Sequence, residues 1–355
     1  MSTLRVSAER LTIHEHPNAD ALELAQVGLY RAVVAKGAYR TGEFAVYIPE
    51  QAVLPDALIG ELGLTGRLAG SAANRVRAVR LRGELSQGIV CRPEALAGTD
   101  LEQAAADGED FAERLGIVKW VPPIPVSMSG DVEAAPDLLP WTDIENLKRY
   151  PDIFAPGDQV VITEKLHGTA CCFSYFADTG RIQVTSKGLG SQRLALQEAD
   201  GNLYWRAVRG HGLPAVAARL AARLDASRVG IFGEVYGAGV QDLGYGEDGR
   251  RDVPAFAAFD VSAEIDGQVR WLDPHELLAG ELPLVPVLFS GPFDLDTALK
   301  LAQGAETVSG RGLHVREGVV VRTADDRYSP VVGGRAIAKV VSDAYLTRKG
   351  GTEYE

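Results

Sequence analysis

Cysteine is scarce in this chain. Cys91, Cys171 and Cys172 are the three cysteines among 355 residues. An odd count with two adjacent members argues against a disulfide framework, and this spacing does not fit a zinc site. We therefore expect three small, buried, hydrophobic side chains and a reducing compartment, the cytoplasm.

Long hydrophobic runs are also missing. No stretch approaches the roughly 20 apolar residues that a membrane-spanning helix needs. The first residues, MSTLRVSAERLT, lack an apolar core flanked by basic residues, so we expect no signal peptide. With 46% hydrophobic and 24% charged residues, the composition is that of an ordinary soluble globular protein. We expect no membrane partner.

Positive charge is in deficit, and the formal net charge is −12. Taken alone, this argues weakly against nucleic acid, although a whole-chain sum does not exclude a local basic groove. The run RVRAVRLR concentrates four arginines, namely Arg75, Arg77, Arg80 and Arg82. Two interpretations stay open for this run: a solvated edge of a barrel, or phosphate contacts made by the N-terminal module.

The length suggests two domains. Residues 1–120 hold short apolar runs separated by glycine-bearing turns, which predicts a small β-barrel. Residues 121–141 contain five prolines and predict a linker. Residues 142–355 mix strands and helices without the regular alternation of a doubly wound sheet, so this part is predicted to be α+β. Within it, we expect residues 192–226 to be helical.

One lysine interrupts an otherwise apolar stretch, VITEKLHGTACCF, at residues 161–173. An ordinary lysine has a pKa of about 10.4, so near pH 7.4 only about one in a thousand is neutral and able to attack. Burial and neighbouring cations would lower the pKa of Lys165 and suit it to attack a phosphate or a carbonyl. His167 points to the same side of a strand, and Gly168 allows a close approach to the backbone. The alternative is a lysine that reaches solvent from the end of a strand.

Six short stretches extend this pattern along the chain. In order they are KLHGT (165–169), TSKG (185–188), IFGEVYG (231–237), FAAFD (256–260), REGVVVR (316–322) and AIAKV (336–340). This ordered set resembles the nucleotidyltransferase motifs of the covalent ligases and RNA capping enzymes. The histidine after the lysine, together with GEVYGAGVQDLGYG further on, makes the chain most similar to the ATP-dependent RNA ligases.

The N-terminal part sharpens this resemblance. TIHEHPNADALELAQVG followed by GEFAVYIP resembles OB-fold modules of the tRNA-binding type. An OB module before the catalytic domain resembles the clade typified by the RNA ligase of Deinococcus radiodurans, since DNA ligases and capping enzymes usually carry theirs after it. The implied fold class is α+β. It comprises an N-terminal OB-like β-barrel and a C-terminal nucleotidyltransferase (ATP-grasp-like) domain of antiparallel sheets with flanking helices.

The resemblance also implies roles for single residues. Lys165 matches the lysine that attacks the α-phosphate of ATP and holds AMP through a phosphoramidate. Glu164 sits where the family contacts the adenine edge, and His167 is placed near the leaving pyrophosphate or the metal. Gly168 completes this motif. Lys187 matches a residue that contacts the ribose and the phosphates.

Four further residues follow from the same comparison of motifs. Glu234 matches a carboxylate that binds the ribose hydroxyls or a metal, and Glu317 matches one that supports the metal. Phe259 matches the aromatic residue that stacks on adenine. Lys339 matches a lysine that binds the α-phosphate. The implied cofactors are therefore ATP, with AMP carried on Lys165, and Mg²⁺ or Mn²⁺.

One departure affects the expected number of cations. The last motif of the family often reads lysine, any residue, lysine, but here Val341 stands where the second lysine could be. Either Lys339 suffices, or Arg335, Arg348 or Lys349 takes that part. The sequence leaves this open.

The resemblance implies that the protein joins 3′-OH and 5′-phosphate RNA ends through lysyl-AMP and adenylylated RNA, in RNA repair or nick sealing. Its implied partner is nicked or end-bearing RNA, with duplex RNA left open, and the N-terminal module is a candidate for contacting nucleic acid. Two alternatives stay open. One is a DNA ligase or a capping-type guanylyltransferase on the same scaffold, and the other is a non-catalytic tRNA- or RNA-binding protein.

Overall fold

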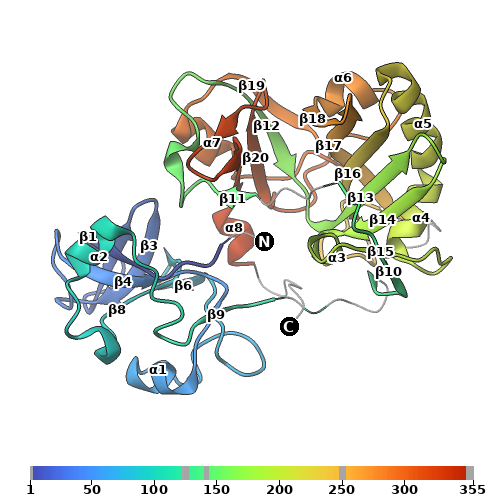
Figure 1. The fold of residues 1–355 in the computed structure, drawn as a ribbon. Helices are drawn as coiled ribbons and strands as arrows, with labels where there is room; N and C mark the ends of the chain where they lie inside the picture. Colours follow the sequence, from blue (N-terminus) through green and yellow to red (C-terminus); the bar gives the residue numbers. More distant parts are fainter. Residues whose placement is uncertain (1–2, 122, 124–127, 140–143, 248–252, 349–355) are drawn as a thin grey trace.

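The computed structural model describes residues 3–121, 123, 128–139, 144–247 and 253–348, and Figure 1 shows their arrangement. The N-terminal residues form a lobe of their own, and the remaining chain builds two sheets above it in this view. The proline-rich linker expected at 121–141 lies partly outside the described residues. The domain boundaries at 120 and 142 therefore stay predictions.

The N-terminal lobe is built on an antiparallel sheet with the strand order β3-β2-β1-β4-β8. Its strands are β1 (Ser7–Glu15), β2 (Leu22–Val27), β3 (Tyr30–Ala35), β4 (Phe44–Ile48) and β8 (Ile89–Cys91). The amide of Gln87 donates to the carbonyl oxygen of Arg31 at 2.7 Å. This bond joins the edge strand β3 to the segment before β8, so the sheet nearly closes into the expected barrel.

Short elements complete this lobe. Two strand pairs are β5 (Ala52–Val53) with β9 (Val118–Lys119), and β6 (Val79–Leu81) with β7 (Glu84–Ser86). The helices are α1 (Asp56–Glu61), η1 (Glu94–Leu96) and α2 (Leu101–Asp107). The β6–β7 turn lies at Gly83, which has a φ of 92° and so adopts the left-handed conformation that glycine tolerates. This hairpin is an example of the short strands joined by glycine-bearing turns that were expected in residues 1–120.

The larger sheet of the C-terminal part has the order β10-β15-β14-β13-β16-β17-β18, and its paired strands are antiparallel. Its strands are β10 (Val132–Ala134), β13 (Gly168–Phe176), β14 (Ile182–Ser186), β15 (Leu194–Leu196), β16 (Arg228–Tyr236), β17 (Ala255–Ile265) and β18 (Gln268–Leu272). Helix α3 (Lys187–Ser191) lies between β14 and β15 in the chain, and α4 (Leu203–Gly210) and α5 (Leu213–Leu224) lie between β15 and β16. Helix α6 (Pro274–Leu278) follows β18.

The smaller sheet has the order β11-β23-β20-β12-β19, and only the β11–β23 pair is parallel among its described pairs. Its strands are β11 (Glu145–Asn146), β12 (Gln159–Lys165), β19 (Val287–Pro292), β20 (Gly318–Thr323) and β23 (Ile337–Val341). Nearby lie η3 (Pro151–Ile153), α7 (Leu295–Leu301), α8 (Asp343–Leu346) and the pair β21 (Tyr328–Ser329) with β22 (Gly334–Arg335). The predicted α+β class is confirmed.

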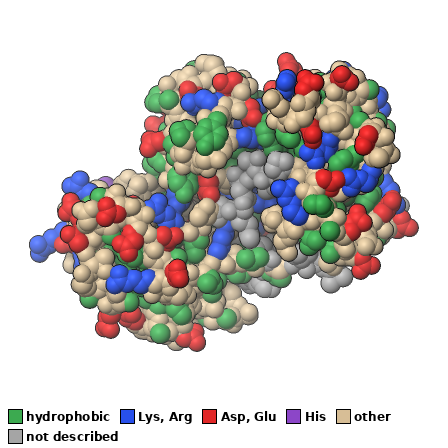
Figure 2. Space-filling model, in the orientation of Figure 1, with side chains coloured by type: hydrophobic (Ala, Val, Ile, Leu, Met, Phe, Trp, Pro, Cys, Tyr) green, Lys and Arg blue, Asp and Glu red, His purple; other side chains and the backbone are tan. Residues whose placement is uncertain are grey.

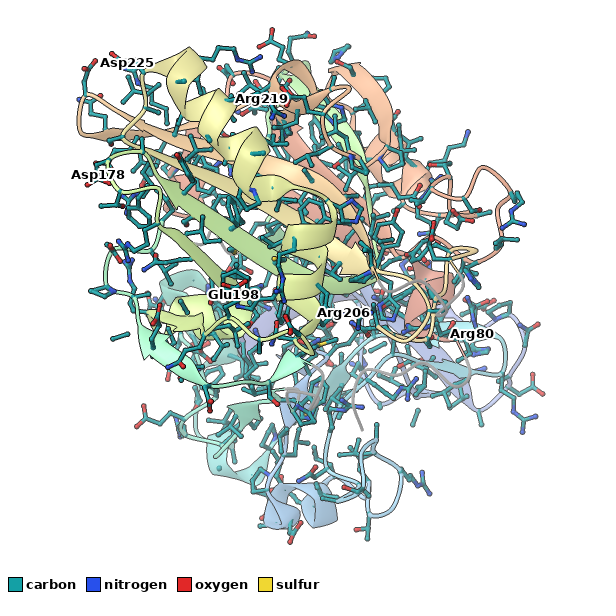
Figure 3. The ribbon with its side chains drawn as sticks, turned by 90° about the vertical axis from the view of Figure 1, so that its right-hand side faces the viewer. Arg80, Asp178, Glu198, Arg206, Arg219 and Asp225 are labelled. Carbon is teal, nitrogen blue, oxygen red and sulfur yellow. The ribbon has the colours of Figure 1, made fainter. Side chains whose placement is uncertain are left out.

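Each sheet packs one face against helices. Helices α4 and α5 cover the larger sheet, where Leu213 and Leu220 are buried against Phe173 and Ile231 of the strands. Figure 3 shows α5 lying across this sheet, with Arg219 on it. Helix α7 buries Ala298 in the core of the smaller sheet. The opposite faces of the two sheets are therefore left to form a site between them.

Some sequence predictions are confirmed and one is wrong. All three cysteines are buried and unpaired, as expected. Residues 192–226 are not all helical, because Leu194–Leu196 form strand β15 between β14 and β10. No helix within the described residues is long and apolar enough to cross a membrane.

Candidate active site

Two adjoining cavities open between the sheets. The first cavity has a volume of about 190 Å³ and is lined by residues of both sheets. The second has a volume of about 440 Å³ and extends toward the N-terminal lobe. Both cavities are lined by Lys165, Ala170, Lys187, Glu234 and Lys339. The predicted nucleophile thus lies where a mainly apolar cavity meets a more polar one. Figure 2 shows the two upper lobes divided by a notch at the top of this view.

Aromatic side chains line the first cavity. Phe232 and Trp271 lie with ring centroids 5.1 Å apart, and Phe259 packs beside them. The guanidinium of Arg335 lies 4.1 Å from the centre of the Trp271 ring and is paired with Asp260. A flat, apolar slot of this kind suits a nucleotide base, which stacks on aromatic rings.

Three lysines of the expected site come together at the junction of the cavities. Lys165 ends β12, Lys187 begins α3 after the capping residue Ser186, and Lys339 lies within β23. Burial, reinforced by Lys187 and Lys165, lowers the pKa of Lys339 to about 7. Burial, reinforced by Lys165, lowers the pKa of Lys187 to about 8. Ammonium groups this crowded favour binding of a polyphosphate.

A fourth lysine, which sequence analysis missed, comes from the N-terminal lobe. Lys119 on β9 lines the second cavity together with the other three lysines. Burial and then Lys187 lower its pKa, and Lys119 in turn contributes to the lowered pKa of Lys339. Lys119 stands 46 positions before Lys165 in a different lobe, so no local pattern in the sequence points to it.

Two carboxylates face this cluster. The Lys165 ammonium donates to Oε1 of Glu317 at 2.6 Å, whereas Oε2 of Glu317 is buried without a hydrogen-bond partner among the described residues. Burial raises the pKa of Glu234 to about 8, against the opposing effect of Lys165. The described residues hold no group of three or more His, Cys, Asp or Glu side chains that could bind a metal. Two carboxylates fit a Mg²⁺ or Mn²⁺ ion that completes its shell with phosphate oxygens and water.

Glu164 points elsewhere. Its carboxylate accepts from the amide of Thr307 at 2.9 Å and from the Thr307 hydroxyl at 2.6 Å, and Arg316 lies 3.4 Å away. Alternate residues of a strand face opposite sides, and Glu164 precedes Lys165 on β12. Glu164 contributes to the wall of the first cavity, but its carboxylate is engaged by Thr307. Its contact with adenine stays a prediction.

The two residues of the nucleophile motif after Leu166 are tightly held. Nδ1 of His167 lies 2.7 Å from the hydroxyl of Tyr345, and Nε2 lies 2.6 Å from Oδ1 of Asp242. A Cβ on Gly168 would lie 2.2 Å from the carbonyl oxygen of Val235, so only glycine fits there. The predicted close approach at Gly168 is that of the neighbouring strand β16. Asp242 and Tyr345 were not foreseen, because they lie 75 and 178 positions from His167.

The described candidates for a second cation near Val341 have other roles. Arg335 is paired with Asp260 and Asp326, and Arg348 is paired with Asp242. Lys349 lies outside the described residues. The structure instead adds Lys119 to the positive charge around Lys339.

The fold and the site together define the class of protein. A lysine at the meeting point of an aromatic slot and a lysine cluster, faced by two carboxylates, is the arrangement of a covalent nucleotidyltransferase. The model of the RNA ligase family matches residues 158–341, which is more than half of the 355 residues. The chain therefore belongs to the RNA ligase family. A second model, described as an OB-fold domain, matches residues 5–93 and confirms the OB-like module.

Solved structures agree on the fold. The RNA ligase of Naegleria gruberi with pyrophosphate is 23% identical, with a TM-score of 0.75 over 97% of this chain and 98% of that one. A lysine-to-alanine variant of that ligase with ATP and Mn is 24% identical, with a TM-score of 0.76 over 96% and 98%. A glutamate-to-alanine variant with AMP and Mn is also 24% identical, with a TM-score of 0.76 over 97% and 98%. No curated protein matches the chain.

Proposed function

We propose that this chain is an ATP-dependent RNA ligase that acts through AMP bound covalently to Lys165. The observation that carries the proposal is the position of Lys165, between an aromatic slot fit for a base and a cluster of lysines fit for phosphates. Membership of the RNA ligase family supplies the class of substrate. The ATP, AMP and Mn present in the Naegleria structures support ATP and Mg²⁺ or Mn²⁺ as cofactors here.

Three transfers make up the reaction. Nζ of Lys165, as the neutral amine, attacks the α-phosphorus of ATP, the bond to the β-phosphate oxygen breaks, and pyrophosphate leaves. A 5′-phosphate oxygen of RNA then attacks the same phosphorus and releases the lysine, which gives adenylylated RNA. The 3′-OH of a second end finally attacks the 5′-phosphorus, loses its proton and expels AMP. Each transfer builds negative charge that nearby cations stabilise.

The remaining residues of the site bind ATP, orient its base and neutralise the charge of its phosphates. Lys187 and Lys339 provide charge at the α-phosphate, and Phe259 stacks on adenine. Glu234 and Glu317 would hold the divalent ion, which supplies further neutralisation of the phosphate charge when bound. Gly168 keeps β13 close to β16, which carries Glu234.

Three narrower assignments belong to the same proposal. The order of OB-like module and catalytic domain favours the clade typified by the Deinococcus radiodurans ligase. The presence of Lys119 at the second cavity supports a part for the N-terminal module in binding nucleic acid or phosphate. The buried, unpaired cysteines suit the cytoplasm.

Labelled nucleotide tests the chemistry directly. The protein is incubated with ATP or GTP labelled in the α-phosphate and Mg²⁺ or Mn²⁺, and acid-labile label on the protein is measured beside the Lys165→Ala variant. We expect label from ATP only, and none on the variant. Label that survives in Lys165→Ala, or equal labelling by GTP, contradicts the proposal, and the second result favours a capping-type enzyme.

Sealing of nicked duplexes tests whether RNA or DNA is the substrate. Nicks with RNA or DNA at the 3′-OH end are offered to the same preparation, and a pre-adenylylated RNA end is offered without ATP. We expect sealing of the RNA 3′ ends and of the pre-adenylylated end. Preference for DNA at the 3′-OH end favours a DNA ligase, and binding of RNA without any label or sealing favours a non-catalytic protein.

A further inference from the structure

The backbone amide and both ring nitrogens of His167 have hydrogen-bond partners. Its backbone amide donates to the hydroxyl oxygen of Tyr245 at 2.8 Å, in addition to the contacts of its two ring nitrogens with Asp242 and Tyr345. The residue is 4% exposed. The Tyr345 ring packs edge-on against the imidazole, with centroids 5.3 Å apart. The ring two residues after the nucleophile therefore has one orientation.

The partners of His167 assign its proton. Asp242 is an acceptor, because hydrogen bonds from Arg348 and from His167 hold the pKa of its carboxyl well below the usual range against the effect of burial. Nε2 of His167 therefore carries the hydrogen and donates it to Asp242. Burial lowers the pKa of His167 and favours the neutral ring. Nδ1 then accepts from the Tyr345 hydroxyl.

Arg348 fixes both partners of the ring at once. Its Nε donates to Oδ2 of Asp242 at 3.0 Å, and its Nη2 lies 3.3 Å from Oδ1. The guanidinium carbon also lies 3.7 Å from the centre of the Tyr345 ring. A planar guanidinium with two bonds to one carboxylate gives a defined geometry. Asp242, Tyr345 and Arg348 thus form one clamp on His167.

Helix α8, which carries Tyr345, is tied to the catalytic strands. Ser342 caps it by accepting from the Tyr345 amide at 3.1 Å, and the Ser342 hydroxyl donates to the carbonyl oxygen of Arg316 at 2.7 Å. The Ser342 amide donates to the carbonyl oxygen of Glu317 at 2.8 Å. Helix α8 is therefore attached to the backbone of Glu317, the residue whose side chain accepts from the Lys165 ammonium.

The same helix reaches the N-terminal lobe. Nε of Arg80 donates to the hydroxyl of Thr347 at 3.2 Å. Arg75 and Arg77 share a small cavity with Leu346 and Arg348. Figure 1 shows α8 between the N-terminal lobe and the two sheets, and Figure 3 marks Arg80 at this junction. Part of the arginine run therefore faces the C-terminal segment.

We propose that Tyr345, Asp242 and Arg348 are positioning residues that act through His167 to fix the loop after Lys165, and that α8 links this loop to the N-terminal module. The inference rests on the proposed lysyl-AMP chemistry. It gives His167 a task that it performs without touching phosphate or metal. A loosened ring would let Leu166–Gly168 move and misplace the amine relative to the α-phosphorus.

A double-mutant cycle tests this role. His167→Ala, Tyr345→Phe and the double variant are compared for the single-turnover rate of lysyl-AMP formation and for KM of ATP. We expect Tyr345→Phe to slow the reaction about 10- to 100-fold, as misplacement of a reacting group does, with KM nearly unchanged. The double variant should be no slower than His167→Ala alone. Losses that multiply overturn the proposal, because Tyr345 would then act independently of His167.

Two further measurements separate positioning from simple loss of structure. Tyr328→Phe, at a tyrosine that is 65% exposed, is the matched control and should behave as the parent. Nitrogen NMR of the imidazole rings, assigned with His167→Ala, should show an Nε2–H tautomer for His167 in the parent and its loss in Tyr345→Phe. A tautomer average in the parent overturns the proposal even if lysyl-AMP forms. Absence of lysyl-AMP in the parent would instead refute the proposed function, and the NMR result would still decide on the clamp.

Discussion

The Lys165 ammonium donates a 2.6 Å hydrogen bond to Oε1 of Glu317, the residue that precedes the neighbouring strand β20. Lys165 pairs in register with Gly318, so the backbone of the two strands sets this contact. A carboxylate at this distance favours the charged lysine, whereas attack on phosphorus requires the neutral amine. Glu317 therefore favours the ammonium form of Lys165 before ATP binds, and we expect its second oxygen, which is buried without a hydrogen-bond partner among the described residues, to accept a cation.

Glu317→Gln should affect both the rate and the metal dependence of lysyl-AMP formation. The amide can still accept from Lys165, but it loses the charge that supports a divalent ion. We expect the rate to fall about 100-fold, the size of effect seen when one preorganised charge or dipole is lost from an active site. The Mg²⁺ or Mn²⁺ concentration that gives half the maximal rate should rise about tenfold or more. The exposed Glu276 on α6 supplies the control, Glu276→Gln. Equal metal dependence in the two variants would rule out this role for Glu317.

ATP affinity should depend on pH through the buried lysines. A bound polyphosphate favours the ammonium forms of Lys339 and Lys187, whose pKa values are about 7 and about 8, so binding takes up protons. Affinity is then highest below pH 7 and falls as pH rises from 7 to 9, by up to about tenfold per pH unit for each lysine.

Calorimetric titration of Lys165→Ala with ATP at constant Mg²⁺ measures this effect without the covalent step. Lys339→Arg in the same background keeps the positive charge across the range, and it should flatten the part of the curve near pH 7. An affinity that is constant between pH 6 and 9, or that increases with pH, would show that these lysines do not lose their charge there.

Gly168→Ala should damage both stability and catalysis. The new Cβ would lie 2.2 Å from the carbonyl oxygen of Val235 and 3.0 Å from Cγ of Glu234, so β13 and β16 must separate. We expect a loss of about 1–3 kcal/mol in the free energy of unfolding, as for other overpacked sites. Lysyl-AMP formation should fall as well, because Glu234 moves. Gly201→Ala, where a Cβ meets nothing within 4 Å, is the control. Similar melting temperatures for the two variants would contradict the steric argument.

Lys165 could be singled out from its neighbours, because it interrupts an apolar strand. Lys187 and Lys339 were expected in the site only because their short motifs resemble those of the covalent ligases. Asp242, Tyr345 and Lys119 could not be predicted, because their roles arise from contacts between distant segments. The contact of the Glu164 carboxylate with Thr307, 143 positions away, could not be predicted either, and the contact of Glu164 with adenine stays a prediction.

The fold shows the same division between local and distant effects. The apolar run of β12 and the helical character of α5 are visible in sequence. Leu194–Leu196 were expected to be helical from their composition, but they lie between two strands and pair with both. Pairing with neighbours overrides a weak helix propensity. Arg75 was expected either at a solvated barrel edge or in contact with phosphate, yet it is buried and its guanidinium packs 4.0 Å from the centre of the Trp120 ring.

Lys119→Ala tests whether the N-terminal lobe takes part in the phosphate site. Its ammonium joins the three lysines at the second cavity, and a charged hydrogen bond to phosphate contributes about 1.5–3 kcal/mol. We expect kcat/KM for lysyl-AMP formation to fall about tenfold or more, and Lys119→Arg to restore most of it. Sealing of a pre-adenylylated RNA end should change less, because that substrate lacks the triphosphate. Lys36→Ala, at an exposed lysine of the same lobe, is the control. If both alanine variants retain the parent rate, the lobe does not contribute charge to the reaction through Lys119.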